Sequence, residues 1–380
     1  MEELTPRERL KIALDHKEPD RVPIDFGGLQ SGIHINAYKK LVSYLGMKLR
    51  ARILDINQQI VEIDEDILKR FKVDNRYIYF NEHNPDGIKV EKKGEEEFYR
   101  DIRGIVWRKP KDGYYFDLYY SPLRNAKLED LEKYRWCRIY DSARFNGISE
   151  KVKFLYNNTD YALVANFQGI LEGSWELRGI EKFFMDVAVN KKFVETLIDK
   201  VLETKKKIYG KFLDIVGSFL SLVKISDDLG TQTGLLFSPD FYRRIVKPRH
   251  RELVRFIKSK TEAKIAIHTD GAIMPILDDL IEAGFEVINP VQISTYGMSS
   301  KKLKEDFGNK ISFWGAIDTQ KILSFGTPGE VEEEVKKMIE NLAPKGGYIL
   351  ASCHNIQAEV RPENICAMFE AAIKYGKYKK

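Results

Sequence analysis

The chain has 380 residues, of which 43% are hydrophobic and 31% charged. This composition provides ample apolar material for a large buried core and too little net charge for an intrinsically disordered protein. The formal net charge is +5, from 62 Lys and Arg against 57 Asp and Glu. Because no basic stripe interleaved with aromatic residues occurs, nucleic acid is not an expected partner.

Membrane insertion and secretion are not expected either. The longest apolar runs fall far short of the roughly 18 to 20 residues that a membrane span needs, and the acidic N-terminus lacks an apolar signal region. The three cysteines, Cys137, Cys353 and Cys366, are too sparse for a disulfide framework and indicate a reducing compartment. We therefore expect a cytoplasmic protein.

The N-terminal quarter alternates between helix and strand. Thr5-Pro6-Arg7-Glu8 combines a capping hydroxyl, a proline at the first helical position and a glutamate three residues after the cap, which predicts a helix to about His16. Residues 21–26 read as a short apolar strand that runs into a glycine turn. Helices are predicted over 36–46 and 58–71 from their apolar spacing, and a second strand over 77–80.

Residues 88–120 differ from this pattern. Segments rich in Tyr, Phe, Val and Trp alternate partially with period two and are separated by Gly94, Gly104 and Gly113. We interpret this stretch as an antiparallel β insertion within a single domain that spans residues 1–380.

From residue 161 onward the alternation of strand and helix returns. Two of the later helices have start signals, Ser238-Pro239-Asp240 and the capping box Thr327-Pro328-Gly329-Glu330. With the two early strands, the count reaches eight strand candidates, each followed by helical sequence, which is typical of a parallel sheet. Eight strands favour a closed (β/α)8 barrel, although the count alone also allows an open doubly wound sheet. The six later candidates are 161–167, 220–226, 264–268, 286–289, 311–314 and 348–351.

Polar side chains collect directly after the late strands. Any one of them is most simply a helix cap, but imidazole and thiol groups are not preferred caps. In a parallel barrel the carboxyl ends of the strands converge on one face, where active sites lie. We therefore expect an active site built from the five segments Asp227-Asp228, His268-Thr269-Asp270-Gly271, Asn289-Pro290-Val291-Gln292, Asp318-Thr319-Gln320 and Cys353-His354-Asn355.

Histidine, carboxylate and a third nitrogen or sulfur donor are the ligands of a catalytic zinc site. His268 and Asp270 lie two residues apart at a strand end, and His354 follows a later strand with Cys353 beside it. A hydrogen-bonded His–Asp pair without metal would have the same sequence. The other histidines have no partner at ligand spacing and are interpreted as surface or capping residues: His16, His34, His83 and His250.

Several common catalytic motifs are missing from the chain. It contains neither the glycine-rich motif of dinucleotide sites, nor the phosphate-binding loop, nor the Gly-x-Ser-x-Gly elbow of serine hydrolases. The chemistry must therefore come from carboxylate, imidazole and amide groups, with or without a metal.

A family resemblance spans nearly the whole chain. The segments that carry it resemble the uroporphyrinogen decarboxylase superfamily. The resemblance implies a (β/α)8 barrel and one of two chemistries: tetrapyrrole decarboxylation, or zinc-dependent transfer of a methyl group from a corrinoid to a thiol such as coenzyme M. The segments are Thr5-Pro6-Arg7-Glu8-Arg9, Pro19-Asp20-Arg21-Val22-Pro23, His268-Thr269-Asp270-Gly271, Cys353-His354-Asn355-Ile356 and Pro362-Glu363-Asn364.

The chain departs from both branches at specific positions. The decarboxylase is expected to carry an Arg-Gln-Ala-Gly-Arg segment that grips substrate carboxylates, but residues 27–34 contain no arginine. The methyltransferases typically show His-x-Cys-Gly and a second cysteine near Pro-Glu-Asn. Here Asp270 replaces the first cysteine, and His354 takes the place of the second, with Cys353 one residue away. The resemblance thus implies the ligand set His268, Asp270 and His354, with less sulfur than the family pattern.

We predict a metal-dependent methyltransferase that uses Zn²⁺ and a corrinoid, on a partner protein, or a small methylated donor. His268, His354 and Asp228 are the predicted catalytic residues, and Asp228 or Asp227 would orient the substrate or act as base. One alternative is a metal-free decarboxylase in which Asp228 stabilises a cationic intermediate and His354 handles a proton. Another is a binding or scaffold barrel that uses the insertion as its contact surface. The predicted substrate contacts are Asp227, Asn289, Gln292, Asp318 and Gln320.

Overall fold

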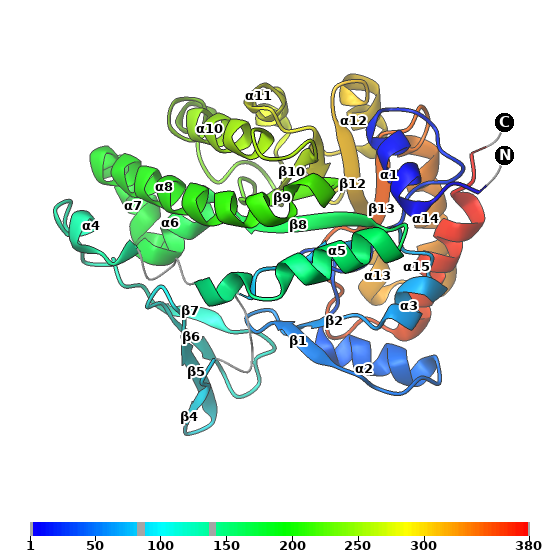
Figure 1. Ribbon diagram of the computed structural model, residues 1–380, viewed down its shortest axis with the longest axis horizontal. Helices are drawn as coiled ribbons and strands as arrows, with labels where there is room; N and C mark the ends of the chain where they lie inside the picture. Colours follow the sequence, from blue (N-terminus) through cyan, green and yellow to red (C-terminus); the bar gives the residue numbers. More distant parts are fainter. Residues whose placement is uncertain (1–2, 82–87, 137–141, 379–380) are drawn as a thin grey trace.

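The computed structural model describes residues 3–81, 88–136 and 142–378. Its centre is a curled parallel sheet whose seven strands follow the order β13-β12-β11-β10-β9-β8-β3 (Figure 1). Each strand corresponds to one predicted from residue 77 onward. The strands are β3 (Asn75–Ile78), β8 (Ala162–Gln168), β9 (Leu222–Ser226), β10 (Lys264–His268), β11 (Val287–Asn289), β12 (Ser312–Ile317) and β13 (Tyr348–Ser352).

The predicted first strand, residues 21–26, forms a single parallel bridge from Ile24 to Leu350 of β13. Leu350 donates its N–H to Pro23 O and accepts from Asp25 N, both at 2.9 Å, while Asp74 N, just before β3, donates to Ile24 O at 2.9 Å. The segment therefore lies between the two edges of the sheet, as a barrel-like α/β fold requires. Pro23 has no N–H to donate, which limits the ladder here.

Helices cover the outer face of the sheet (Figure 1). Both predicted capping boxes are present, Thr5 with Glu8 and Thr327 with Glu330. No helix among the described residues is both long enough and apolar enough to cross a membrane. The helices are α1 (Pro6–Leu14), α2 (Ile35–Tyr44), α3 (Glu65–Arg70), α4 (Asp130–Lys133), α5 (Ile148–Asn158), α6 (Ile170–Arg178), α7 (Ile180–Val189), α8 (Lys191–Val216), α9 (Pro239–Phe241), α10 (Lys247–Lys258), α11 (Leu277–Ala283), α12 (Ser300–Phe307), α13 (Ile322–Phe325), α14 (Pro328–Leu342) and α15 (Pro362–Tyr375).

The helix predicted over 58–71 is wrong in its first half. Residues there form β2 (Ile60–Glu62), which pairs antiparallel with β1 (Arg52–Asp55). Only α3 is helical, and it begins where Asp64 accepts a hydrogen bond from Asp66 N at 3.1 Å. Pairing with β1 stabilises residues 60–62 as a strand, and this tertiary contact outweighs the helical spacing of their apolar residues.

The predicted insertion is an antiparallel sheet of four strands: β4 (Glu91–Lys93), β5 (Glu96–Arg100), β6 (Val106–Lys109) and β7 (Asp117–Tyr120). Figure 1 shows it projecting from the parallel sheet beneath α4 and α6. Tyr99, Trp107 and Phe116 are buried, and the Tyr99 and Phe116 rings lie 5.1 Å apart between centroids. The insertion thus has its own aromatic core.

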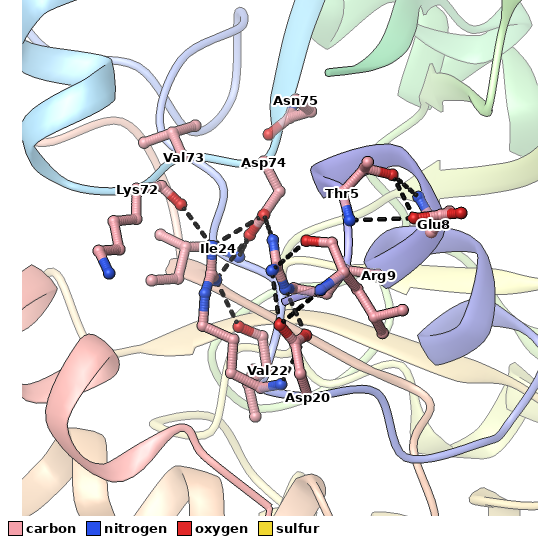
Figure 2. A network of polar contacts seen from close by, with 12 residues as sticks. Thr5, Glu8, Arg9, Asp20, Val22, Ile24, Lys72, Val73, Asp74 and Asn75 are labelled. Carbon is pink, nitrogen blue, oxygen red and sulfur yellow. Dashed lines mark hydrogen bonds and ion pairs between the residues drawn. The ribbon is translucent and has the colours of Figure 1, made fainter. Parts of the chain in front are cut away.

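A buried ionic network fastens the N-terminal segment to β3 (Figure 2). Asp74 Oδ1 lies 2.6 Å from Arg9 Nη1, and Asp74 Oδ2 lies 2.8 Å from Arg21 Nη1. Asp74 also accepts from Ile24 N at 2.7 Å, and Arg9 forms a second ion pair with Asp20. These contacts hold α1 and residues 21–26 against the edge of the sheet.

Candidate functional site

The structure brings together three potential metal ligands from two strand ends. His268 ends β10 with Asp270 two residues later, and His354 lies two residues beyond β13. One ligand atom from each residue lies within 4.8 Å of the others. The two imidazole centroids are 6.0 Å apart, and His354 Nε2 is 4.0 Å from Asp270 Oδ2. We call these three residues the triad.

A chain of hydrogen bonds determines which nitrogen of His268 faces the other two residues of the triad. Asn289 Nδ2 donates to Trp314 O at 3.1 Å, so its Oδ1 is the atom that contacts His268 Nδ1, at 2.6 Å. The Nδ1 must therefore carry the proton, and Nε2 keeps its lone pair. In a metal-binding histidine, the ring nitrogen that does not bind the metal typically donates a hydrogen bond to a neighbouring group. Asn289 was predicted to contact substrate, but it is fully buried and orients His268 instead.

The electrostatic surroundings of the triad favour the binding of a cation. Burial lowers the pKa of His268 well below its usual value and also lowers the pKa of His354. Burial raises the pKa of Asp270 to about 7. Burial and the nearby Asp270 charge raise the pKa of Asp228 to about 7 as well, although Asp228 accepts a hydrogen bond from Asp270 N at 2.9 Å. Neutral imidazoles beside poorly solvated carboxylates suit a divalent cation.

The donor set fits zinc. Two imidazole nitrogens and one carboxylate oxygen are ligands that zinc accepts, and three protein ligands leave the fourth position free for substrate or water. The structure supplies such a set, because one donor atom from each of His268, Asp270 and His354 lies within 4.8 Å of the other two.

Cys353 was predicted as a possible fourth ligand, but the structure directs its thiol elsewhere. Its Sγ donates to Val291 O at 3.4 Å, and the residue is not part of the triad. Burial raises the pKa of the thiol, which keeps it protonated and a poor ligand. His354, one residue later, takes the position that faces the site.

Asp227 was predicted as a substrate contact, and in the structure its carboxylate is occupied by protein groups. It is fully buried and accepts from Ile170 N at 2.7 Å and Glu172 N at 2.9 Å, which caps α6. His250 Nε2 lies 2.9 Å from Asp227 Oδ2. His250, predicted on the surface or at a cap, is also fully buried. His34 does cap a helix, α2, and His83 lies outside the described residues.

A cavity of about 1880 Å³ opens beside the triad. Asp228, His268 and His354 line one part of it, and residues of the insertion line another. Sequence reasoning missed its remaining polar residues. Gln168 ends β8 and Glu172 lies in the first turn of α6, so the strand-end pattern could have found both, but the others lie further along helices or in the insertion, where no such signal exists. They include Arg103, Gln168, Glu172, Glu176 and Lys205.

These missed residues form a connected polar wall. Arg103 pairs with Glu176 and, at 2.8 Å, with Asp101. Gln168 donates to Glu176 at 2.8 Å and accepts from Lys205 Nζ at 3.1 Å. The cations of this wall are therefore already engaged by protein groups.

A second cavity, of about 600 Å³, lies on another side of the triad. Asp270 and His354 line it together with Gln292 and Gln320, two of the predicted substrate contacts. Gln292 Oε1 also accepts from Gly271 N at 2.8 Å, which holds the loop after β10. Asp318 is buried and accepts from Gln320 N at 2.8 Å, so it shapes the loop and is not among the lining residues of either cavity.

Comparisons with known proteins agree with this architecture. A methyltransferase from Methanosarcina mazei superposes with a TM-score of 0.67 at 19% sequence identity, covering 98% of this chain and 99% of that one, which shows a shared fold. A uroporphyrinogen decarboxylase from Vesicomyosocius okutanii subsp. Calyptogena okutanii (strain HA) is 29% identical over 76 residues, so the chain matches only 21% of that relative's length. The family model described as uroporphyrinogen decarboxylase (URO-D) matches residues 121–375, well over half of the chain. The protein therefore belongs to the uroporphyrinogen decarboxylase (URO-D) family.

Proposed function

We propose that this protein is a metal-dependent methyltransferase that moves a methyl group from a corrinoid or a small methylated donor to a small acceptor such as a thiol. The observation that carries the proposal is the orientation of His268. Because Asn289 holds its Nδ1, its Nε2 is directed toward the group that contains Asp270 and His354. Zn²⁺ is the proposed metal, since these donors suit it and leave one position open.

The residues of the site have separate roles in this proposal. A zinc ion held by the triad would lower the pKa of an acceptor bound at the open position. The Asp228 carboxylate accepts a hydrogen bond from the Asp270 N–H, and Asp228 lines the large cavity beside His268. In the transfer, the acceptor loses its proton to solvent and bonds to the methyl carbon. The bond from that carbon to the donor breaks, and the donor keeps the electron pair.

The turn after residues 21–26 supports methyl transfer over tetrapyrrole decarboxylation. Residues 27–34 contain no arginine that could grip substrate carboxylates. At Gly28, where φ is +75°, an added Cβ would lie 2.6 Å from the Tyr77 ring, so this turn is tightly fitted to the barrel wall. Arg103, which lines the large cavity, already pairs with the carboxylates of Asp101 and Glu176.

Metal content and activity test the proposal together. We expect purified protein reconstituted with Zn²⁺ to hold one ion per chain by elemental analysis, and the His268→Ala variant to hold far less. We expect the reconstituted protein, but not the variant, to transfer methyl groups from methylcobalamin or a methylated amine to a small thiol. Carbon dioxide release from a carboxylated substrate in the presence of chelator would instead support a decarboxylase. A stable complex with a corrinoid protein without turnover would support a scaffold.

A further inference from the structure

The triad lies between two cavities that share little of their lining. Among the described lining residues, His268 and Asp228 face only the large cavity, whereas Asp270 faces only the small one. His354 lines both. A metal at the triad would thus be reachable from two sides.

We propose that the smaller cavity is the acceptor site and that the methyl donor occupies the larger one. This inference rests on the proposed function, because methyl transfer places the nucleophile and the leaving group on opposite sides of the methyl carbon. Two cavities that meet at one triad satisfy this geometry without either substrate passing the other. Their volumes, about 600 and 1880 Å³, match a small acceptor and a bulky donor.

The charge of the smaller cavity restricts the acceptor further. Asp117 and Glu359 line it in addition to the proposed metal ligand Asp270, and its described lining includes neither lysine nor arginine. Asp117 and Glu359 form no ion pair with any residue that the structure describes. Carboxylates without countercharge repel an anionic ligand. The acceptor is therefore a small neutral or cationic compound, and a sulfonated or carboxylated thiol is disfavoured.

Besides Tyr115, Thr319 and Cys353, the uncharged polar lining of this cavity consists of amide groups. Four glutamines line it, and amides offer both donors and acceptors to an uncharged polar group. Gln357 Nε2 is already engaged by Asn355 O at 2.6 Å, and its Oε1 accepts from Tyr115. Gln320, exposed at the rim, is the member of the set that can be enlarged without disturbing the core. The glutamines are Gln58, Gln292, Gln320 and Gln357.

Cobalt(II) replacing zinc provides a readout that does not depend on turnover. Binding of a thiolate to cobalt(II) produces a charge-transfer absorption band, which can be titrated with three thiols of similar size: cysteamine, 2-mercaptoethanol and 2-mercaptoethanesulfonate. We expect the first two to bind at least about tenfold more tightly than the sulfonate. The double variant Asp117→Lys with Glu359→Lys, at two exposed positions, should reverse the order of cysteamine and the sulfonate.

A matched pair of variants distinguishes the two cavities. Gln320→Trp fills the smaller cavity, and Gln30→Trp introduces the same side chain in the larger one. We expect Gln320→Trp to weaken binding of 2-mercaptoethanol at least about tenfold and Gln30→Trp to leave it unchanged, with the cobalt(II) d–d bands and circular dichroism preserved in both.

The failures of the two proposals are distinguishable. Intact cobalt(II) bands with equal affinity for all three thiols, or a block by Gln30→Trp alone, would overturn the assignment of the smaller cavity and leave the metal centre standing. Absence of cobalt(II) bands in the wild-type protein would overturn the proposed function and this inference with it.

Discussion

A single carboxamide determines the protonation of His268. Asn289 is fully buried, donates to a main-chain carbonyl and accepts from the imidazole, so its orientation is not free to change. Such a group raises the basicity of the histidine and fixes its ring, and the loss of comparable groups weakens metal binding.

Replacing Asn289 with leucine should therefore lower the affinity for Zn²⁺ by about 10- to 100-fold, the range seen when such supporting groups are lost. Competition with a chromophoric chelator measures the affinity directly. Asn289→Asp, which retains an acceptor oxygen, is the matched control and should bind zinc close to the wild-type level. Wild-type affinity in the leucine variant would show that the hydrogen bond does not support the metal site.

Asp227 and Asp228 are adjacent in sequence but have different surroundings. Asp227→Ala would leave two N–H groups at the start of α6 and the buried His250 ring without their acceptor. We expect a loss of about 3–5 kcal/mol in the free energy of unfolding, measured by urea denaturation. Asp228→Ala should lose less stability and instead impair methyl transfer. A stable but inactive Asp227→Ala protein would restore the original interpretation of Asp227 as a substrate contact.

At the scale of elements, α6 and α14 begin in different ways. The first turn of α14 is capped locally by Thr327, whereas α6 has no cap from its own N-cap residue, Gly169. The N–H groups of Ile170 and Glu172 in its first turn instead donate to Asp227, which follows β9. The start of α6 therefore depends on the packing of helix against strand and has no local sequence signal.

The two glycines near these helix starts should respond oppositely to alanine. At Gly169 an added Cβ would lie 2.1 to 2.4 Å from the Asp227 carboxylate atoms, so Gly169→Ala should cost about 1–3 kcal/mol in the free energy of unfolding. At Gly329 the nearest atom is 4.0 Å away. Gly329→Ala should be neutral or stabilise the protein by up to about 1 kcal/mol. Thermal unfolding of both variants measures the difference, and equal effects would refute this account of Gly169.

For the whole molecule, the triad connects distant parts of the chain. His268 ends the middle strand β10 and His354 follows β13, so a bound metal would link them across the sheet. The N-terminal segment is also fastened between the sheet edges, through Asp74 and its two arginines.

Zinc should therefore stabilise the folded protein as a whole. A ligand that binds only the folded state adds about 2.7 kcal/mol when its concentration is 100 times its Kd. We expect the midpoint of urea unfolding to rise with added zinc and to fall back when chelator is added. The His268→Ala variant should show no such rise, and a rise of equal size in that variant would place the zinc elsewhere.

Most of the fold could be predicted from local patterns. Apolar runs of strand length located the seven strands of the sheet, and the capping boxes at Thr5 and Thr327 located two helix starts. Residues 58–71 were predicted wrongly because β2 pairs with β1, and a local pattern does not include a pairing partner. The segment 21–26 was expected as a strand but makes only one bridge, because Pro23 interrupts the ladder.

The place of the candidate site could be predicted from the order of residues, because parallel strands bring their carboxyl ends to one face and a polar residue after each strand has a predictable place. His268, Asp270 and His354 follow this rule. Which neighbour faces the site did not follow from it. In each adjacent pair, side-chain direction decides which residue faces the site. Asp227 points to the start of α6, which leaves Asp228. The Cys353 thiol points to Val291 O, which leaves His354. The wall of Arg103 and Lys205 comes from an insertion and a distant helix, so only the folded chain brings these residues to the cavity.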